Sequence, residues 1–287
     1  MNLADPQDHI RSAADLAAHA SELLDNLAIE RAHVLGTSLG GFIAQELTLQ
    51  RPELVDRLVL ICPSHGGPKS KPPSWGDLLA MLGSGATNRA DAARRGLKSA
   101  TSDAYRAERP EEFAQVLQWR ITYAPSQPAY LEQILAGSRF NLSQNVHDIR
   151  SPTLVLHGSE DRVVPVDNAV ALDEAIPDSR LRIFEGAGHL VFIERAEELN
   201  EEILSFLGAE RAPSTNGRVG GQQIRFPYIC GDTPLLTQHL LDTRICAASL
   251  GGSMSADNAT STAGEFVFLV ALLFLVTGAL AMTCPLV

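Results

Sequence analysis

Two spacings of apolar residues run through residues 1–207, and they predict a mixture of helices and strands. Residues 8–27 carry apolar side chains at helical spacing and predict one amphipathic helix. Compact apolar runs at residues 33–35 and 153–156 are typical of buried parallel strands. Apolar residues alternate with charged ones at 181–183, which predicts a further strand, and a helical pattern returns at 196–207.

A largely helical stretch lies between the strands predicted at residues 33–35 and 153–156. Residues 65–73 form a loop rich in Pro, Gly and Lys, and helical patterns follow at 77–82, 90–99 and 110–123. Another helical pattern begins at 131. We therefore expect a helical insertion over residues 65–149.

The pattern changes after residue 207. Residues 208–263 combine a Pro/Ser/Gly-rich linker with weakly periodic and low-complexity sequence. Residues 266–287 contain no charged side chain and are long enough to form a membrane helix. Three interpretations stay open: a C-terminal membrane anchor, a fused or frame-shifted piece, which we favour, or disorder apart from this helix.

Composition excludes some functions. The net charge is −11 and there is no basic cluster, which argues against nucleic-acid binding. No metal-ligand spacing and no phosphate-binding glycine loop is found, so we expect neither a metal nor a cofactor. Cys62 is the single cysteine of residues 1–207, which favours a cytoplasmic location for this part. If residues 266–287 form a membrane helix, the protein would also be attached to a membrane through this segment.

The strongest chemical signal is the G-x-S-x-G pattern that runs from Gly36 to Gly40. It joins an apolar strand directly to a helical pattern, and a serine at such a turn is held in a strained backbone with its hydroxyl presented. The bare pattern arises by chance in roughly one chain in ten of this length, so an idle glycine turn is the alternative. Two later segments weigh against that alternative.

Asp161 follows the strand at 153–156 after a glycine turn, and His189 follows the strand at 181–183 on a glycine-rich loop. Chemistry gathers at the carboxyl edge of parallel strands, where a carboxylate can orient an imidazole. Glu160 is the nearest competitor for the acidic role. A histidine on such a loop suits a proton carrier.

These segments carry a family resemblance. Residues 8–207 resemble an α/β-hydrolase-fold protein of the esterase, lactonase and non-heme haloperoxidase type, through matching motifs at 36–41, 51–60, 158–161 and 188–189. The resemblance implies that Ser38 is the nucleophile, His189 the general base and then acid, and Asp161 the residue that orients His189. It also implies that the backbone N–H of Leu39 is one oxyanion donor.

The fold expected from the resemblance is α/β, with a mostly parallel sheet flanked by helices. Residues 1–64 and 150–207 would form the hydrolase core, and residues 65–149 a helical cap. Residues 208–263 would be a linker, and 264–287 a transmembrane helix.

The chain departs from the family pattern at its start. Family members carry strands and a His-Gly loop well upstream of the nucleophile, whereas 30 residues precede the strand here. We therefore expect an N-terminally truncated sheet without its first strands, with residues 33–35 at an exposed edge. One oxyanion donor would be lost, at a cost of about 10²–10³ in turnover. A start site assigned too late, or a truncated gene, explains this most simply.

The function implied is a serine hydrolase that cleaves a small ester or lactone through an acyl-enzyme on Ser38. Thr37, Trp119 and Tyr123 are candidates for the substrate pocket, although aromatic residues at helical spacing are more often core. Alternatives are a haloperoxidase-like or perhydrolase activity with the same triad, a non-catalytic remnant or fusion product, and a membrane-tethered scaffold. The sequence predicts no oligomeric state.

Overall fold

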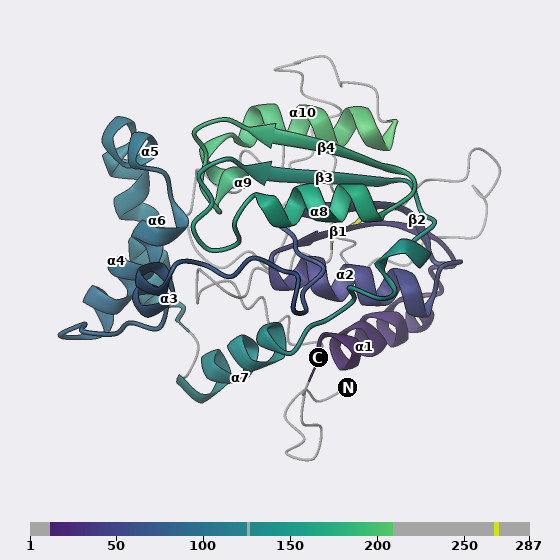
Figure 1. Cartoon of the computed structure of the whole chain (residues 1–287), viewed down its shortest axis with the longest axis horizontal. Coiled ribbons are helices and arrows are strands. Elements are labelled where there is room, and N and C mark those ends of the chain that lie inside the picture. Colours follow the sequence, from purple (N-terminus) through teal and green to yellow (C-terminus); the bar gives the residue numbers. More distant parts are fainter. Residues whose placement is uncertain (1–11, 125–126, 209–266, 270–287) are drawn as a thin grey trace, which may run out of the picture.

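The computed structural model of the 287-residue chain describes residues 12–124, 127–208 and 267–269. Five parallel strands form one sheet in the order β4-β3-β2-β1-β5 (Figure 1). The strands are β1 (Ala32–Thr37), β2 (Val55–Ile61), β3 (Thr153–Gly158), β4 (Ser179–Phe184) and β5 (Val267–Leu269). The predicted strands at 33–35, 153–156 and 181–183 are confirmed, and so is the α/β class.

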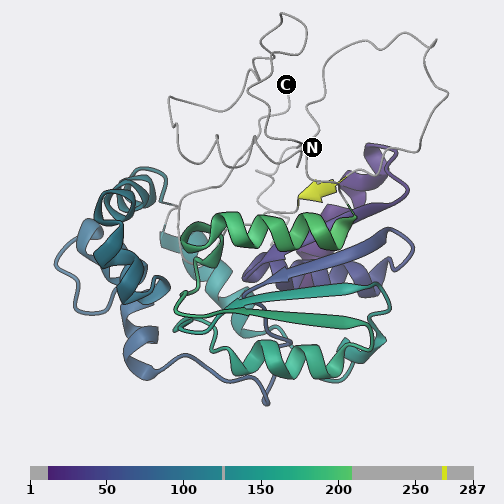
Figure 2. The same cartoon turned by 90° about the horizontal axis from the view of Figure 1, so that it is seen from above.

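Helices cover both faces of the sheet. The helices α1 (Ala13–Asn26), α2 (Leu39–Gln50) and α8 (Asp167–Ala175) share one apolar cluster, and α10 (Ala196–Leu207) belongs to the other (Figure 2). Successive strand residues point to opposite faces: Val155 faces the first cluster, whereas Leu154 and Leu156 face the second. This double burial explains why the strands read as continuous apolar runs.

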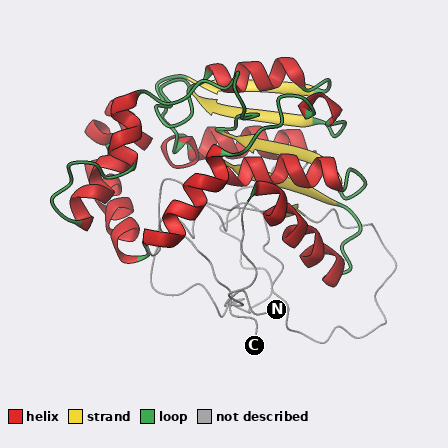
Figure 3. Cartoon of the chain, turned by 60° about the horizontal axis from the view of Figure 1, so that its bottom comes forward, coloured by secondary structure: helices red, strands yellow, loops and turns green. Residues whose placement is uncertain are grey.

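Five helices and a 3₁₀ turn lie between β2 and β3. They are α3 (Trp75–Met81), α4 (Arg89–Ala100), α5 (Asp103–Glu108), α6 (Pro110–Thr122), α7 (Gln127–Ser138) and the turn Val146–Asp148. The helices α3 to α6 gather at one end of the sheet (Figure 3), beyond the arrowheads of β3 and β4 in Figure 1. The short α5 has no counterpart among the sequence-based predictions.

Side chains that cap helices set several of these boundaries. Each capping residue lies just before its helix, and its side chain accepts a hydrogen bond from a backbone N–H of the first turn. The capping residues are Ser12 for α1, Ser74 for α3, Asn88 for α4 and Ser102 for α5. At the other end, α10 stops at Gly208, whose φ of 76° is left-handed.

The edge at β1 differs from the prediction. The segment β5 pairs in parallel with β1, with His33 opposite Val267 and Leu35 opposite Leu269, so β1 has a neighbour on both sides. An unpaired strand edge presents backbone N–H and C=O groups that can pair with any extended segment that reaches it. This pairing is the physical reason that residues 267–269 form a strand and not a helix. The predictions of an exposed β1 edge and of a helix at 267–269 are wrong.

The remainder of the predicted transmembrane helix, and residues 209–263 of the predicted linker, lie outside the described residues. Within the ranges that the structure does describe, no helix combines the length and apolarity needed to cross a bilayer.

Gly36 is predicted to be intolerant of a side chain. A Cβ at this position would overlap the carbonyl group of Gly40 and lie 2.7 Å from the nitrogen of Gly41, because β1 and α2 meet here backbone to backbone. We expect Gly36→Ala to lower the free energy of unfolding by about 1–3 kcal/mol, measured by urea denaturation.

Gly76→Ala is the matched control, because Gly76 lies within α3 and the atom nearest to its added Cβ, Oγ of Ser74, is 3.9 Å away. It should leave stability unchanged or raise it by up to about 1 kcal/mol. Equal urea midpoints for the two variants would contradict the close approach at Gly36.

Candidate active site

Ser38 occupies the turn between β1 and α2. Its φ of 53° and ψ of −118° lie in a region that residues other than glycine rarely adopt, and its N–H donates to the Ile61 carbonyl at 2.9 Å. Although Ser38 holds the N-cap position of α2, its side chain makes no capping hydrogen bond. The strained turn therefore leaves the hydroxyl free to serve another purpose.

Leu39 is the first residue of α2. The first N–H groups of a helix have no carbonyl partner one turn earlier, and the helix dipole makes this end favourable for negative charge. The backbone N–H of Leu39 thus lies beside Ser38 with the properties of an oxyanion donor.

Asp161 follows β3 by three residues, and its carboxylate is fully buried. One oxygen, Oδ1, accepts hydrogen bonds from the N–H groups of Val163 and Val164, both at 2.8 Å. The other, Oδ2, is 2.7 Å from Nδ1 of His189. Its neighbour Glu160 is exposed to solvent, so the geometry favours Asp161 as the partner of His189.

His189 lies on the loop between β4 and α9 (Val191–Glu194) and is buried. Its Nε2 has no hydrogen-bond partner among the residues that the structure describes. With Nδ1 bound to Asp161, the free Nε2 is the nitrogen that can accept a proton.

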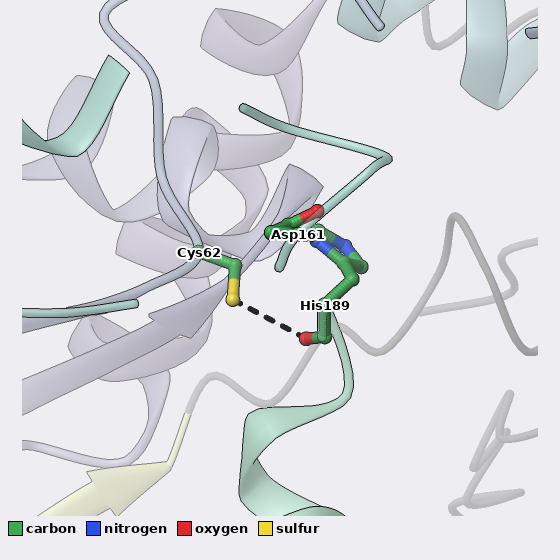
Figure 4. Close-up of side chains that lie close together, drawn as sticks. All are labelled: Cys62, Asp161 and His189. Carbon is green, nitrogen blue, oxygen red and sulfur yellow. Dashed lines mark hydrogen bonds and ion pairs between the residues drawn. The ribbon is translucent and has the colours of Figure 1, made fainter. Parts of the chain in front are cut away.

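Cys62 connects these loops to the turn that holds Ser38. Its thiol donates to the His189 carbonyl oxygen at 3.2 Å, and Figure 4 shows the sulfur directed at that oxygen beside Asp161. Because Ser38 bonds to Ile61, the residue before Cys62, the loops after β1, β2, β3 and β4 meet at the carboxyl edge of the sheet. This is the edge at which the sequence predicts the site.

Gly158 makes the approach of the histidine loop to β3 feasible. A Cβ at Gly158 would overlap the carbonyl groups of Ala187 and Gly188, which lie directly against it. Gly158 is therefore needed for two reasons: it allows this close packing, and it begins the turn that leads to Asp161.

The charge state of Asp161 follows from these partners. Burial by itself would raise its pKa, but the interaction with His189 and the hydrogen bonds from His157 and His189 outweigh burial, so the pKa is lowered. Asp161 is therefore an ionised carboxylate that can stabilise an imidazolium.

The donor atoms of Cys62, Asp161 and His189 lie within 4.8 Å of one another, close enough for a shared ion. Burial raises the pKa of the Cys62 thiol well above its ordinary value, and the nearby Asp161 charge adds to the effect. A metal requires the thiolate, and the carboxylate and imidazole already bind each other, so we assign no metal to this cluster.

Glu194 is a buried acidic residue that the sequence analysis missed. Its carboxylate accepts hydrogen bonds from the N–H and hydroxyl of Ser102, at 3.1 and 2.6 Å, and from the N–H of Gly188 at 3.2 Å. Leu190 adds a backbone bond to Ala100 at 3.0 Å. These contacts attach the His189 loop to the helical insertion at the junction of α4 and α5.

The predicted pocket residues have different surroundings. Thr37 is buried at the end of β1 next to Ser38. Trp119 is partly buried in the apolar cluster of the insertion, and Tyr123 follows α6 and is 54% exposed. Pocket contacts of Thr37, Trp119 and Tyr123 all stay a prediction.

Comparison with known proteins now identifies the class. The alpha/beta hydrolase fold family matches residues 7–196. A 2-hydroxy-6-oxononadienedioate/2-hydroxy-6-oxononatrienedioate hydrolase from Paraburkholderia phymatum is 32% identical over 205 residues, which cover 69% of each chain. A 2-hydroxymuconate semialdehyde hydrolase from Pseudomonas putida is 32% identical over 70% of this chain and 71% of its own.

Solved structures agree with this class. An N-acyl homoserine lactone degrading enzyme is 28% identical, with a TM-score of 0.58 over 70% of this chain and 77% of its own. A meta-cleavage product hydrolase from Pseudomonas fluorescens is 25% identical, with a TM-score of 0.58 over 71% and 74%. The chain belongs to the α/β-hydrolase family, and its relatives are enzymes that act on small molecules.

Glu194 is predicted to make stability depend on pH. Burial raises its pKa above the ordinary value of 4.5, despite the hydrogen bonds from Ser102 and Gly188. The folded state therefore takes up a proton at higher pH than the unfolded state. As pH falls from neutral to about 5, the wild type should gain unfolding free energy relative to Glu194→Gln, which does not titrate.

Urea midpoints across this pH range measure the difference. The control is Glu197→Gln, because Glu197 is exposed on α10, and its difference from the wild type should stay flat. A flat difference for Glu194→Gln would show that burial does not penalise its charge.

Proposed function

We propose that this chain is a serine hydrolase that cleaves a small ester or lactone through an acyl-enzyme on Ser38. The observation that carries the proposal is the buried pair of Asp161 and His189, 2.7 Å apart, at the sheet edge where Ser38 occupies a strained turn. A nucleophile, a base and a residue that orients the base are the parts that acyl transfer needs.

The reaction has two steps. In the first, Nε2 of His189 takes the Ser38 hydroxyl proton as the oxygen attacks the substrate carbonyl, and His189 then returns the proton to the leaving group. In the second, His189 activates water, which releases the acyl group from Ser38. Asp161 holds the imidazole with its Nδ1–H toward the carboxylate and stabilises its charged form.

The Leu39 N–H is the proposed oxyanion donor, and α3 to α6 are the proposed cap. The insertion packs directly on the catalytic loops, since Val163 and Leu190 share an apolar cluster with Leu97 and Phe113. A cover of this kind excludes water and limits the size of the substrate. The similarity to a lactone-degrading enzyme supports the proposed substrate class. A perhydrolase activity would use the same three residues.

Replacement of the nucleophile tests the proposal. We expect wild-type protein to react covalently with a fluorophosphonate probe and to hydrolyse a nitrophenyl butyrate ester. Ser38→Ala should not label and should lower kcat by about 10³-fold or more, because no other described group supplies the attacking oxygen. Mass spectrometry of the labelled peptide locates the adduct.

Ser84→Ala is the matched control, an exposed serine of the insertion that should label as the wild type does. Wild-type protein that is folded by circular dichroism yet stays unlabelled would favour the non-catalytic interpretation.

A second candidate function is hydrolysis of a carboxylate-bearing substrate, and Arg120 is the observation that favours it. This α6 residue is 6% exposed, its Nη1 has no hydrogen-bond partner, and no described carboxylate forms an ion pair with it. Burial lowers its pKa to about 10, against a smaller opposing influence of Tyr130, so it remains charged at neutral pH.

A buried cation without a counterion is costly, and a substrate carboxylate would remove that cost. Relatives of this chain are named for 2-hydroxy-6-oxononadienedioate, a compound whose name specifies carboxylate groups. We infer that Arg120 selects an anionic substrate.

A pair of similar esters tests this inference. Arg120→Gln should lower kcat/KM for a mono-nitrophenyl succinate by about tenfold or more, because a charge-assisted hydrogen bond is lost. The neutral nitrophenyl butyrate should change much less. Arg120→Lys keeps the charge and should lie between the wild type and Arg120→Gln for the succinate ester. Equal losses for both esters would show that Arg120 has a purely structural role.

A further inference from the structure

A second histidine lies against the carboxylate that orients His189. His157 is the fifth residue of β3 and is completely buried. Its Nε2 is 2.8 Å from the Val164 carbonyl oxygen and 3.1 Å from Oδ2 of Asp161. The proposed mechanism gives this imidazole no part.

The surroundings fix the tautomer of His157. Both neighbours of Nε2 are hydrogen-bond acceptors, the carbonyl of Val164 and the ionised Asp161, so Nε2 must carry the hydrogen. The other nitrogen, Nδ1, is buried without a partner among the described residues. A proton there would be a buried donor with no acceptor, which is costly. His157 is therefore neutral, with its hydrogen on Nε2.

This N–H completes the set of donors around Asp161. Oδ1 receives the N–H groups of Val163 and Val164, and Oδ2 receives Nδ1 of His189. The Nε2–H of His157 bonds to the Val164 carbonyl oxygen at 2.8 Å and is shared with Oδ2, which lies 3.1 Å from Nε2. Two oxygens of a carboxylate offer about four lone-pair sites, so each site has a donor. The carboxylate is held on both oxygens and cannot rotate without losing a bond.

We propose that His157 is a positioning residue, whose Nε2–H fixes Oδ2 of Asp161 and shares its charge with His189. The proposal rests on the acyl-transfer function proposed above. It assigns His157 no contact with substrate.

The shared charge has a consequence for pH dependence. When His157 donates to Oδ2, part of the negative charge there is neutralised, and Asp161 attracts the His189 proton less strongly. Without that donor, protonated His189 is held more firmly. The acid limb of the pH–rate profile, which reports protonation of the general base, should then move to higher pH.

Other titratable groups around the site stay the same when His157 is replaced. On β3 and its loop the group is Asp161, and on β4 the residue opposite His157 is the apolar Ile183. Those on neighbouring elements are Cys62 of the loop after β2 and Glu194 of α9, and Tyr105 of α5 lies near Glu194. A shift of the limb on replacement of His157 alone is thus assigned to the lost donor.

Two variants of similar shape test the proposal. His157→Gln keeps an N–H donor near the position of Nε2, whereas His157→Met removes it. We expect His157→Met to lower kcat for nitrophenyl butyrate about tenfold and to move the acid limb up by about 0.5 to 1 pH unit. His157→Gln should stay within about threefold of the wild type, with the limb unmoved. Equal losses and unmoved limbs in both variants would overturn the proposal.

A measurement without substrate tests the positioning role of His157 separately from the acyl-transfer function of Ser38. In wild-type protein labelled with nitrogen-15 histidine, NMR at neutral pH should show His157 protonated on Nε2 and not on Nδ1. The Nδ1–H resonance of His189 should shift in His157→Met and not in His157→Gln. A proton on Nδ1 of His157 would overturn this proposal even where Ser38 is active. Unreactive Ser38 with these NMR results would overturn the acyl-transfer proposal alone.

Discussion

The carboxylate of Asp161 is the constraint on which the rest of the site depends. A fully buried charge is tolerable only when it is paired and hydrogen-bonded, and Asp161 has two backbone donors and two imidazoles. Each partner is thereby fixed as well: His189 through Nδ1, and the Val163–Val164 backbone through its N–H groups. The pair is consequently a rigid unit, and Nε2 of His189 is the one nitrogen of its ring left for a proton.

A parallel sheet brings this unit to the same edge as Ser38, the proposed nucleophile. Parallel strands end at a common edge, so residues distant in sequence, such as Ser38 and His189, reach the same place on successive loops. Close backbone contacts at Gly36 and Gly158 let β1 meet α2 and let the histidine loop pack against β3. The insertion then packs on the loops through Leu190 and Val163, and Glu194 attaches the histidine loop to it. The insertion therefore packs against the same edge of the sheet at which these loops lie.

The fold alone leaves the substrate undecided, because α/β-hydrolase relatives of this chain include enzymes named for lactones and for dienedioates. Side chains within the site have to make that distinction. Arg120 is the residue proposed to make this distinction, since a buried guanidinium with no counterion among the described residues favours an anionic group. The proposed catalytic residues would serve either substrate equally.

The sequence by itself determined the α/β class, most of the strands, the Gly36–Gly40 turn and the order of Ser38, Asp161 and His189, because strand periodicity and glycine turns are local signals. Only the tertiary structure brought Glu194 to the histidine loop and placed His157 against the carboxylate. It also paired β5 with β1, where the sequence predicted an open edge and an apolar helix. These outcomes depend on burial and on contacts between residues far apart in the chain, which no local pattern encodes.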